Sequence, residues 1–123
     1  VLTKPRSRGR LLLVSADPDI APRIEHRYDS EPRDIADLRA GCDTVADIVR
    51  GATELGEPRW STSQHLCGTA PMGIGGGAVV DPLCRVIGMD GLSVIDGSIL
   101  WRIPTRGPHA TIAMLAHRAA EFF

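Results

Sequence analysis

The chain has 123 residues, the size of one small domain and enough in principle to bury most of its apolar surface. Its 14 lysines and arginines balance 15 aspartates and glutamates, so the charge gives no reason to expect a nucleic acid or an anionic membrane as partner. Its uninterrupted apolar runs are far shorter than the roughly 20 residues of a membrane-spanning helix. We therefore expect a small-molecule or protein partner and no membrane span.

The ends and the cysteines bear on the cellular location. No charged-then-apolar leader follows Val1, so we expect no secretion. The three cysteines, Cys42, Cys67 and Cys84, are an odd number without a CxxC pair, which favours reduced thiols and a cytoplasmic location. A start within what reads as mid-chain sequence indicates a truncated chain or a reading frame that opens inside a longer gene.

The first half of the chain predicts a strand and a helix. Residues 9–15 (GRLLLVS) are a short apolar run between turn formers, followed by a turn rich in Pro and Asp. From residue 32 to about residue 50, apolar side chains recur every three or four positions, which predicts a helix with one buried face. Ser30 or Asp34 is its candidate cap, and Gly51 is its candidate end.

The second half predicts short strands before a closing helix. The glycine-rich residues 73–77 predict a loop. Short strands are predicted at Val79 and Val80, within 81–91, and at 92–95, the last of them buried. Pro108 near a first turn predicts a helix over residues 108–122. The pattern as a whole indicates a mixed α/β (α+β) fold.

Two histidines are candidates for chemistry. His65 lies on irregular backbone before Gly68 and can act as a general base, because imidazole titrates near neutral pH; the alternative is a histidine hydrogen-bonded within a loop. His109 opens the closing helix, where N–H donors and the helix dipole favour an anion or an electron-rich ring such as reduced flavin; the alternative is an ordinary helix cap. His26 and His117 fit solvated or structural roles.

Asp96 and Gly97 end the predicted buried strand, and ligands of α/β sheets gather at the carboxyl ends of strands. Asp96 would accept a bond from a cofactor hydroxyl and Gly97 would allow close backbone approach, although a plain turn also explains them. The GIGGGA run at 73–78 lacks the strand and helix of a dinucleotide fingerprint. His65, Cys67 and Cys84 match no common zinc spacing, so we expect no metal site.

Four blocks in order carry a family resemblance: HLCGTAPMG at 65–73, VVD at 79–81, DGS at 96–98, and His109 opening a last helix. Together they resemble the C-terminal signature of the glucose-methanol-choline (GMC) flavoprotein oxidoreductases. Residues 8–27 also resemble a substrate-domain segment of that family, and the tail is similar to members associated with the redox peptide mycofactocin. The resemblance implies an FAD-dependent alcohol oxidoreductase.

Residue by residue, the resemblance implies His65 as the catalytic base and His109 as its partner on the substrate oxygen. Asp96 and Gly97 would touch FAD, and the backbone of His109, Ala110 and Thr111 would lie near the electron-rich edge of the flavin. Hydride from the alcohol carbon would go to flavin N5.

The resemblance also implies a C-terminal fragment of a GMC fold. Residues 1–60 would end the substrate-binding domain, and residues 61–123 would form the catalytic, FAD-contacting segment with the last strand and helix of the Rossmann-like FAD domain. The chain lacks the family's N-terminal glycine fingerprint that grips the FAD diphosphate, so we expect weak FAD binding, exposed apolar helix faces, and instability or oligomerisation unless an N-terminal half is supplied in cis or in trans. The alternative function is a non-catalytic remnant or interaction module.

Overall fold

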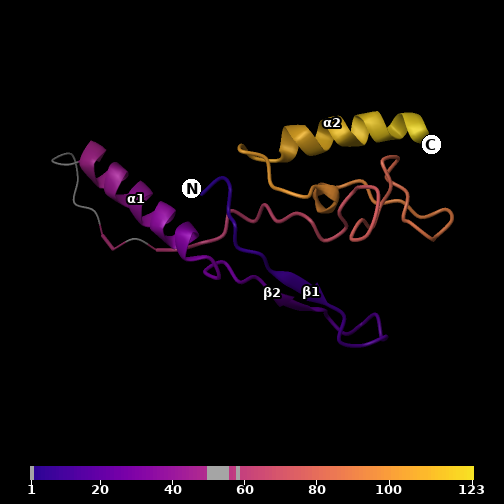
Figure 1. The fold of residues 1–123 in the computed structure, drawn as a ribbon, viewed down its shortest axis with the longest axis horizontal. Coiled ribbons are helices and arrows are strands. Elements are labelled where there is room, and N and C mark those ends of the chain that lie inside the picture. The colour runs from indigo at the N-terminus through magenta and orange to yellow at the C-terminus, as the bar shows by residue number, and fades with distance from the viewer. Residues whose placement is uncertain (1, 50–55, 58) are drawn as a thin grey trace. The chain divides into compact units, whose positions relative to one another are not determined.

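The computed structural model describes residues 2–49, 56–57 and 59–123, which separate into two compact units, Val1–Ser63 and Gln64–Phe123. The elements in chain order are β1 (Arg10–Leu12), β2 (Arg23–Glu25), α1 (Pro32–Val49), the 3₁₀ helix η1 (Gly97–Ile99), α2 (His109–Ala119) and the 3₁₀ helix η2 (Ala120–Phe122), as Figure 1 shows. The described elements form the mixed α/β arrangement that the sequence predicts.

A short antiparallel hairpin opens the first unit (Figure 1). Its register sets Arg10 opposite Glu25, Leu11 opposite Ile24 and Leu12 opposite Arg23. The Arg10 guanidinium donates to the Glu25 carboxylate across the pair, with Nε 2.7 Å from Oε2. A side chain on Gly9 would collide with the carbonyl oxygen of Glu25, so the chain needs glycine immediately before β1. β1 is shorter than the predicted strand at 9–15, and β2 is an addition to the prediction.

The helix predicted from residue 32 to about residue 50 is confirmed as α1. Gly51, its predicted end, lies outside the described residues. The apolar side of α1 is only partly covered, since Val45 is 53% and Ile48 is 77% exposed. The first unit therefore covers only part of the apolar face that the helical period predicts to be buried, as we expect for a helix without its sheet neighbours.

Asp34 does not cap α1, so this prediction is wrong. The residue lies inside the helix and is 1% exposed, and its carboxylate accepts the backbone N–H groups of Arg6 (2.9 and 3.0 Å) and Ser7 (2.7 Å). Burial, the largest influence, raises the pKa of Asp34, but the bonds from Ser7 and Arg6 outweigh it and leave the pKa lowered. The other candidate cap, Ser30, donates its backbone N–H to the carbonyl of Arg27. Asp34 thus anchors the N-terminal segment to α1.

The second unit has a small apolar core. Its buried members are Val80, Cys84, Ile99 and Ala119, and Met72, Val86, Val94, Ile95, Leu115 and Phe122 pack against them. Ala119, Leu115 and Phe122 come from α2 and η2, so the C-terminal helix covers the irregular segment that precedes it (Figure 1). The predicted closing helix at 108–122 is confirmed as α2 followed by η2.

The short strands predicted in this unit are not formed. Single bridges replace them, joining Val80 to Met72 and to Val86, and Arg85 to Ser93. The Asp81 carboxylate accepts the N–H groups of Leu83 (2.8 Å) and Arg85 (3.0 Å) and closes a tight turn between these extended pieces. The pieces therefore meet through isolated bridges and separate hydrogen bonds, such as that from the Val94 N–H to the Cys84 carbonyl, and not through a continuous ladder.

Cys84 occupies the inner side of that turn. Its backbone is in the left-handed region at φ 64, although it is not glycine, and its side chain is 3% exposed. Burial, followed by the nearby Asp81 carboxylate, raises the pKa of the Cys84 thiol.

Within the described ranges, no helix is both long and apolar enough to cross a membrane.

Candidate active site

An open cleft of about 610 Å³ in the unit Gln64–Phe123 brings together four predicted site residues, namely His65, Asp96, Gly97 and His109. The rest of its lining is Gln64, Leu66, Cys67, Thr69, Ser98, Gly107, Pro108 and Ile112. Ala110 and Thr111 follow His109 in the first turn of α2 and are not among the lining residues. Three stretches distant in sequence therefore meet at one cleft.

Backbone hydrogen bonds join the histidine loop to η1. The N–H groups of Gly68 and Ala70 both donate to the carbonyl of Ser98 at 3.1 Å, and the N–H of Met72 donates to Ile99 at 2.9 Å. Gln64, immediately before His65, has a left-handed φ of 60, a conformation that costs a non-glycine residue on the order of 1 kcal/mol. The loop is thus held in one conformation beside η1, and that conformation sets the direction of His65.

The imidazole of His65 lies against the backbone that leads into α2. A Cβ built on Gly107 would be 3.7 Å from Cε1 of His65. Gly107 is two residues before His109, so both histidines border the same end of the cleft. Sequence reasoning did not single out Gly107, although its place directly before Pro108 and the helix was a usable signal.

The start of α2 supplies hydrogen-bond donors. Pro108 is the residue before the helix and makes no side-chain cap bond, while its carbonyl accepts the N–H of Ile112 at 2.8 Å. His109 is consequently the first residue of the helix and not its cap. The N–H groups of the first turn have no carbonyl partner within the helix, so the dipole and the donors favour electron-rich groups there.

Asp96 is not the end of a buried strand, contrary to the prediction. It caps η1, because its Oδ1 accepts the N–H of Ser98 at 2.7 Å and also the Ser98 hydroxyl. The residue is exposed in the cleft lining, and the hydrogen bonds described for its carboxylate all go to Oδ1. The DGS block is therefore a capped turn beside the histidine loop.

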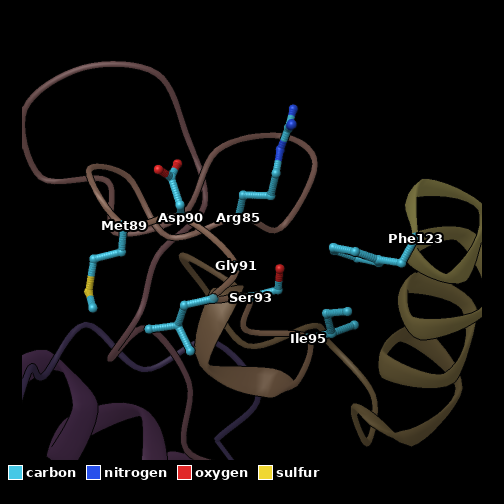
Figure 2. A pocket seen from close by; sticks show the side chains of 8 residues that line it. Arg85, Met89, Asp90, Gly91, Ser93, Ile95 and Phe123 are labelled. Carbon is cyan, nitrogen blue, oxygen red and sulfur yellow. The ribbon is translucent and has the colours of Figure 1, made fainter.

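A second hollow of about 500 Å³ in the same unit contains none of the predicted site residues. It is lined by Arg85, Met89, Asp90, Gly91, Leu92, Ser93, Ile95 and Phe123. Figure 2 shows the ring of Phe123 reaching toward it from the end of the C-terminal helix. No group of three or more His, Cys, Asp or Glu side chains able to hold a metal occurs among the residues described. The histidine cleft is the better candidate for chemistry.

Comparison with known proteins identifies the family of the chain. The family model described as GMC oxidoreductase matches residues 5–116. A GMC-type oxidoreductase of Rhodococcus erythropolis is 43% identical over 136 residues, and the match covers 98% of this chain and 28% of that protein. An alcohol dehydrogenase (acceptor) of Pseudomonas putida is 32% identical over 139 residues, covering 95% of this chain and 25% of the relative.

Among solved structures, pyridoxine 4-oxidase from Mesorbium loti matches with a TM-score of 0.85 at 25% identity, covering 98% of this chain and 28% of that one. The chain thus spans about a quarter of the length of the relatives it matches. The similarity to the mycofactocin-associated members stays a prediction, as does the cytoplasmic location. Because the family model covers most of the sequence, the chain belongs to the GMC oxidoreductase family.

Proposed function

We propose that this chain is the part of an FAD-dependent alcohol oxidoreductase that carries the catalytic histidines, with His65 as the base and His109 as its partner. The observation that supports this most is the cleft where both histidines meet the turn at Asp96 and Gly97. The alcohol dehydrogenase among the relatives supports an alcohol as substrate.

The residues of the cleft fit the ring portion of a flavin, the cofactor on which GMC oxidoreductases in general depend. Gly97 presents backbone without a side chain, and the first-turn N–H groups of α2, at His109, Ala110 and Thr111, are donors suited to an electron-rich edge. Asp96 would accept a hydrogen bond from a cofactor hydroxyl through Oδ2. When bound, FAD supplies the hydride acceptor, flavin N5.

The chain's own residues would handle the proton. The neutral imidazole of His65 takes the hydroxyl proton of the alcohol, and the electron pair left on oxygen forms the carbonyl as hydride departs from carbon. His109 donates a hydrogen bond to the same oxygen and stabilises the negative charge that develops on it. The backbone held between Gln64 and Ser98 keeps His65 in place for this transfer.

The same proposal assigns a different role to each half of the chain. Residues 1–60 would be the end of a substrate-binding domain, and residues 61–123 would be the catalytic and FAD-contacting segment. The FAD-binding half, in cis or in trans, would grip the diphosphate. Exposed apolar side chains such as Ile48, at 77%, and Ile74, at 94%, are consistent with contacts to such a half or to other copies of the chain.

The first test is the visible absorption spectrum of the purified chain after incubation with FAD and removal of free cofactor. We expect a retained flavin band, weaker than in an enzyme with both halves. The second test is His65→Ala in the FAD-loaded protein with the FAD-binding half present. Turnover should fall about a thousandfold, because a positioned base contributes roughly 10²–10⁴ in rate, while the flavin stays bound.

His117→Ala is the matched control, since His117 lies near the exposed end of α2 and outside the cleft lining. Its turnover should equal that of the parent protein. Added imidazole should partly rescue His65→Ala through the open cleft. Unchanged turnover in His65→Ala would overturn the assignment of the base, and a protein that takes up no FAD even with the other half present would favour the non-catalytic alternative.

A further inference from the structure

We infer that Ile112 is a positioning residue that sets the separation between His65 and His109 through its contact with Gly97. Ile112 is one helical turn after His109, so the two side chains share a face of α2. This inference rests on the proposed function, because it concerns how that site is held in shape.

Gly97 is the point at which the three stretches of the cleft converge. A Cβ built on Gly97 would lie 3.1 Å from Cδ1 and 3.9 Å from Cγ1 of Ile112, and 3.8 Å from the carbonyl oxygen of Leu66. Leu66 follows His65 directly. The glycine therefore has the histidine loop on one side and the helix of His109 on the other, and a methyl group there would need Cδ1 of Ile112 to shift by a few tenths of an ångström.

The demand for glycine here is steric and not conformational. Gly97 is the first residue of η1 and is not among the glycines with positive φ, so alanine can adopt its backbone conformation. An added methyl group would press on Cδ1 of Ile112 at 3.1 Å, whereas the carbonyl oxygen of Leu66 at 3.8 Å is at an ordinary contact distance. Because Ile112 follows His109 by one turn of α2, we expect this displacement to be passed to the first turn of the helix and to His109.

A pair of substitutions tests this contact. Gly97→Ala adds the methyl group, and Ile112→Val in the same chain removes the Cδ1 atom that it would strike. Gly76→Ala is the matched control, because Gly76 has no atom within 4 Å of a built Cβ and no positive φ. The dissociation constant for FAD is measured by flavin fluorescence, and the Cε1–H signals of His65 and His109 are measured by NMR, with His117 as internal reference.

We expect Gly97→Ala to weaken FAD binding about fivefold or more, as an overpacked methyl group does, and to shift the signals of both site histidines but not that of His117. The second substitution, Ile112→Val, should restore both readouts toward the parent values. A merely structural role for Ile112 would lower the melting temperature without moving the two signals together.

The inference would be overturned if Gly97→Ala had the same FAD affinity and histidine signals as the control Gly76→Ala. It would also be overturned if adding Ile112→Val to Gly97→Ala brought neither readout closer to the parent protein. If the parent protein takes up no FAD even with the FAD-binding half present, the proposed function fails, whereas the histidine signals still decide whether Ile112 positions the pair.

Discussion

Different interactions stabilise the interior of each of the two units. In Val1–Ser63, the one fully buried side chain among the described residues is the carboxylate of Asp34, and apolar side chains such as Leu13 (83% exposed) and Ile48 (77%) stand in solvent. In Gln64–Phe123, the buried side chains include Val80, Cys84 and Ile99, which form an apolar cluster. The first unit depends on polar contacts and the second on burial of apolar surface.

This difference explains why the candidate site lies in the second unit. Exposed ion pairs, such as those of Arg10 and Arg27 with Glu25, are screened by water and contribute little to fixing a reactive geometry. A packed core under a hydrogen-bonded loop fixes side-chain positions far better. The histidine loop and η1 are tied to such a core through Ile99.

The largest expected effect is that of truncating this core. Ile99→Ala removes a side chain that is 2% exposed and should destabilise the second unit by about 3 kcal/mol, as is usual for isoleucine cavities. Ile48→Ala makes the same chemical change on the exposed face of α1 and should cost less than about 0.5 kcal/mol. Hydrogen exchange resolved by residue measures both, and equal losses would contradict the contrast between the units.

A smaller effect should follow from removing the buried charge of the first unit. Asp34→Asn keeps the shape of the side chain but weakens the bonds from Arg6 and Ser7, at a cost of about 2 kcal/mol, because bonds to charged groups are the stronger ones. The amides of Arg6 and Ser7 should exchange faster with solvent, while residues 64–123 keep their protection. Unchanged exchange at Arg6 and Ser7 would show that the carboxylate does not anchor this segment.

The smallest effect concerns acid and the hairpin. The hydrogen bond from Arg10 is the largest influence on Glu25, and with that from Arg27 it lowers the pKa of Glu25 to about 2 from the ordinary 4.5. Since the folded pKa is depressed, the stabilisation is complete above about pH 4.5 and is lost as the pH falls toward 2. NMR titration of the Glu25 carboxyl should show this, and Arg10→Gln should raise the midpoint. An identical midpoint in the variant would exclude Arg10 as the cause.

Local sequence signals were sufficient for the helices but not for the strands. The spacing of apolar side chains predicted α1, and Pro108 near a first turn predicted the closing helix. β2 has a single apolar residue, Ile24, between charged neighbours, and it exists only because β1 pairs with it 13 residues away. Residues 92–95 are apolar enough for a strand, but they form one bridge, from Ser93 to Arg85, and separate hydrogen bonds at Leu92 and Val94 in place of a ladder.

The site shows the same boundary between local and long-range information. The four sequence blocks that resemble the family signature predicted His65, Asp96, Gly97 and His109 as site residues, and these four residues line one cleft. The contact between Gly97 and Ile112 depends on how distant segments approach, so no local pattern predicts it. The cap that Asp96 makes on Ser98 is local, and it corresponds to the plain turn that was the alternative for this block. Which residues meet FAD or the substrate stays a prediction.

Cys84, at the left-handed turn, is buried in the second unit, so its reaction with a thiol reagent measures how often that unit opens. A buried, protonated thiol is a poor nucleophile, so a thiol reagent can modify Cys84 only when the core opens, whereas Cys42 and Cys67 are partly accessible. The rate of the slow phase of labelling is then set by how often the core opens. Because Cys84 packs in the same cluster as Ile99, that rate reports the opening of the core to which the histidine loop is hydrogen-bonded.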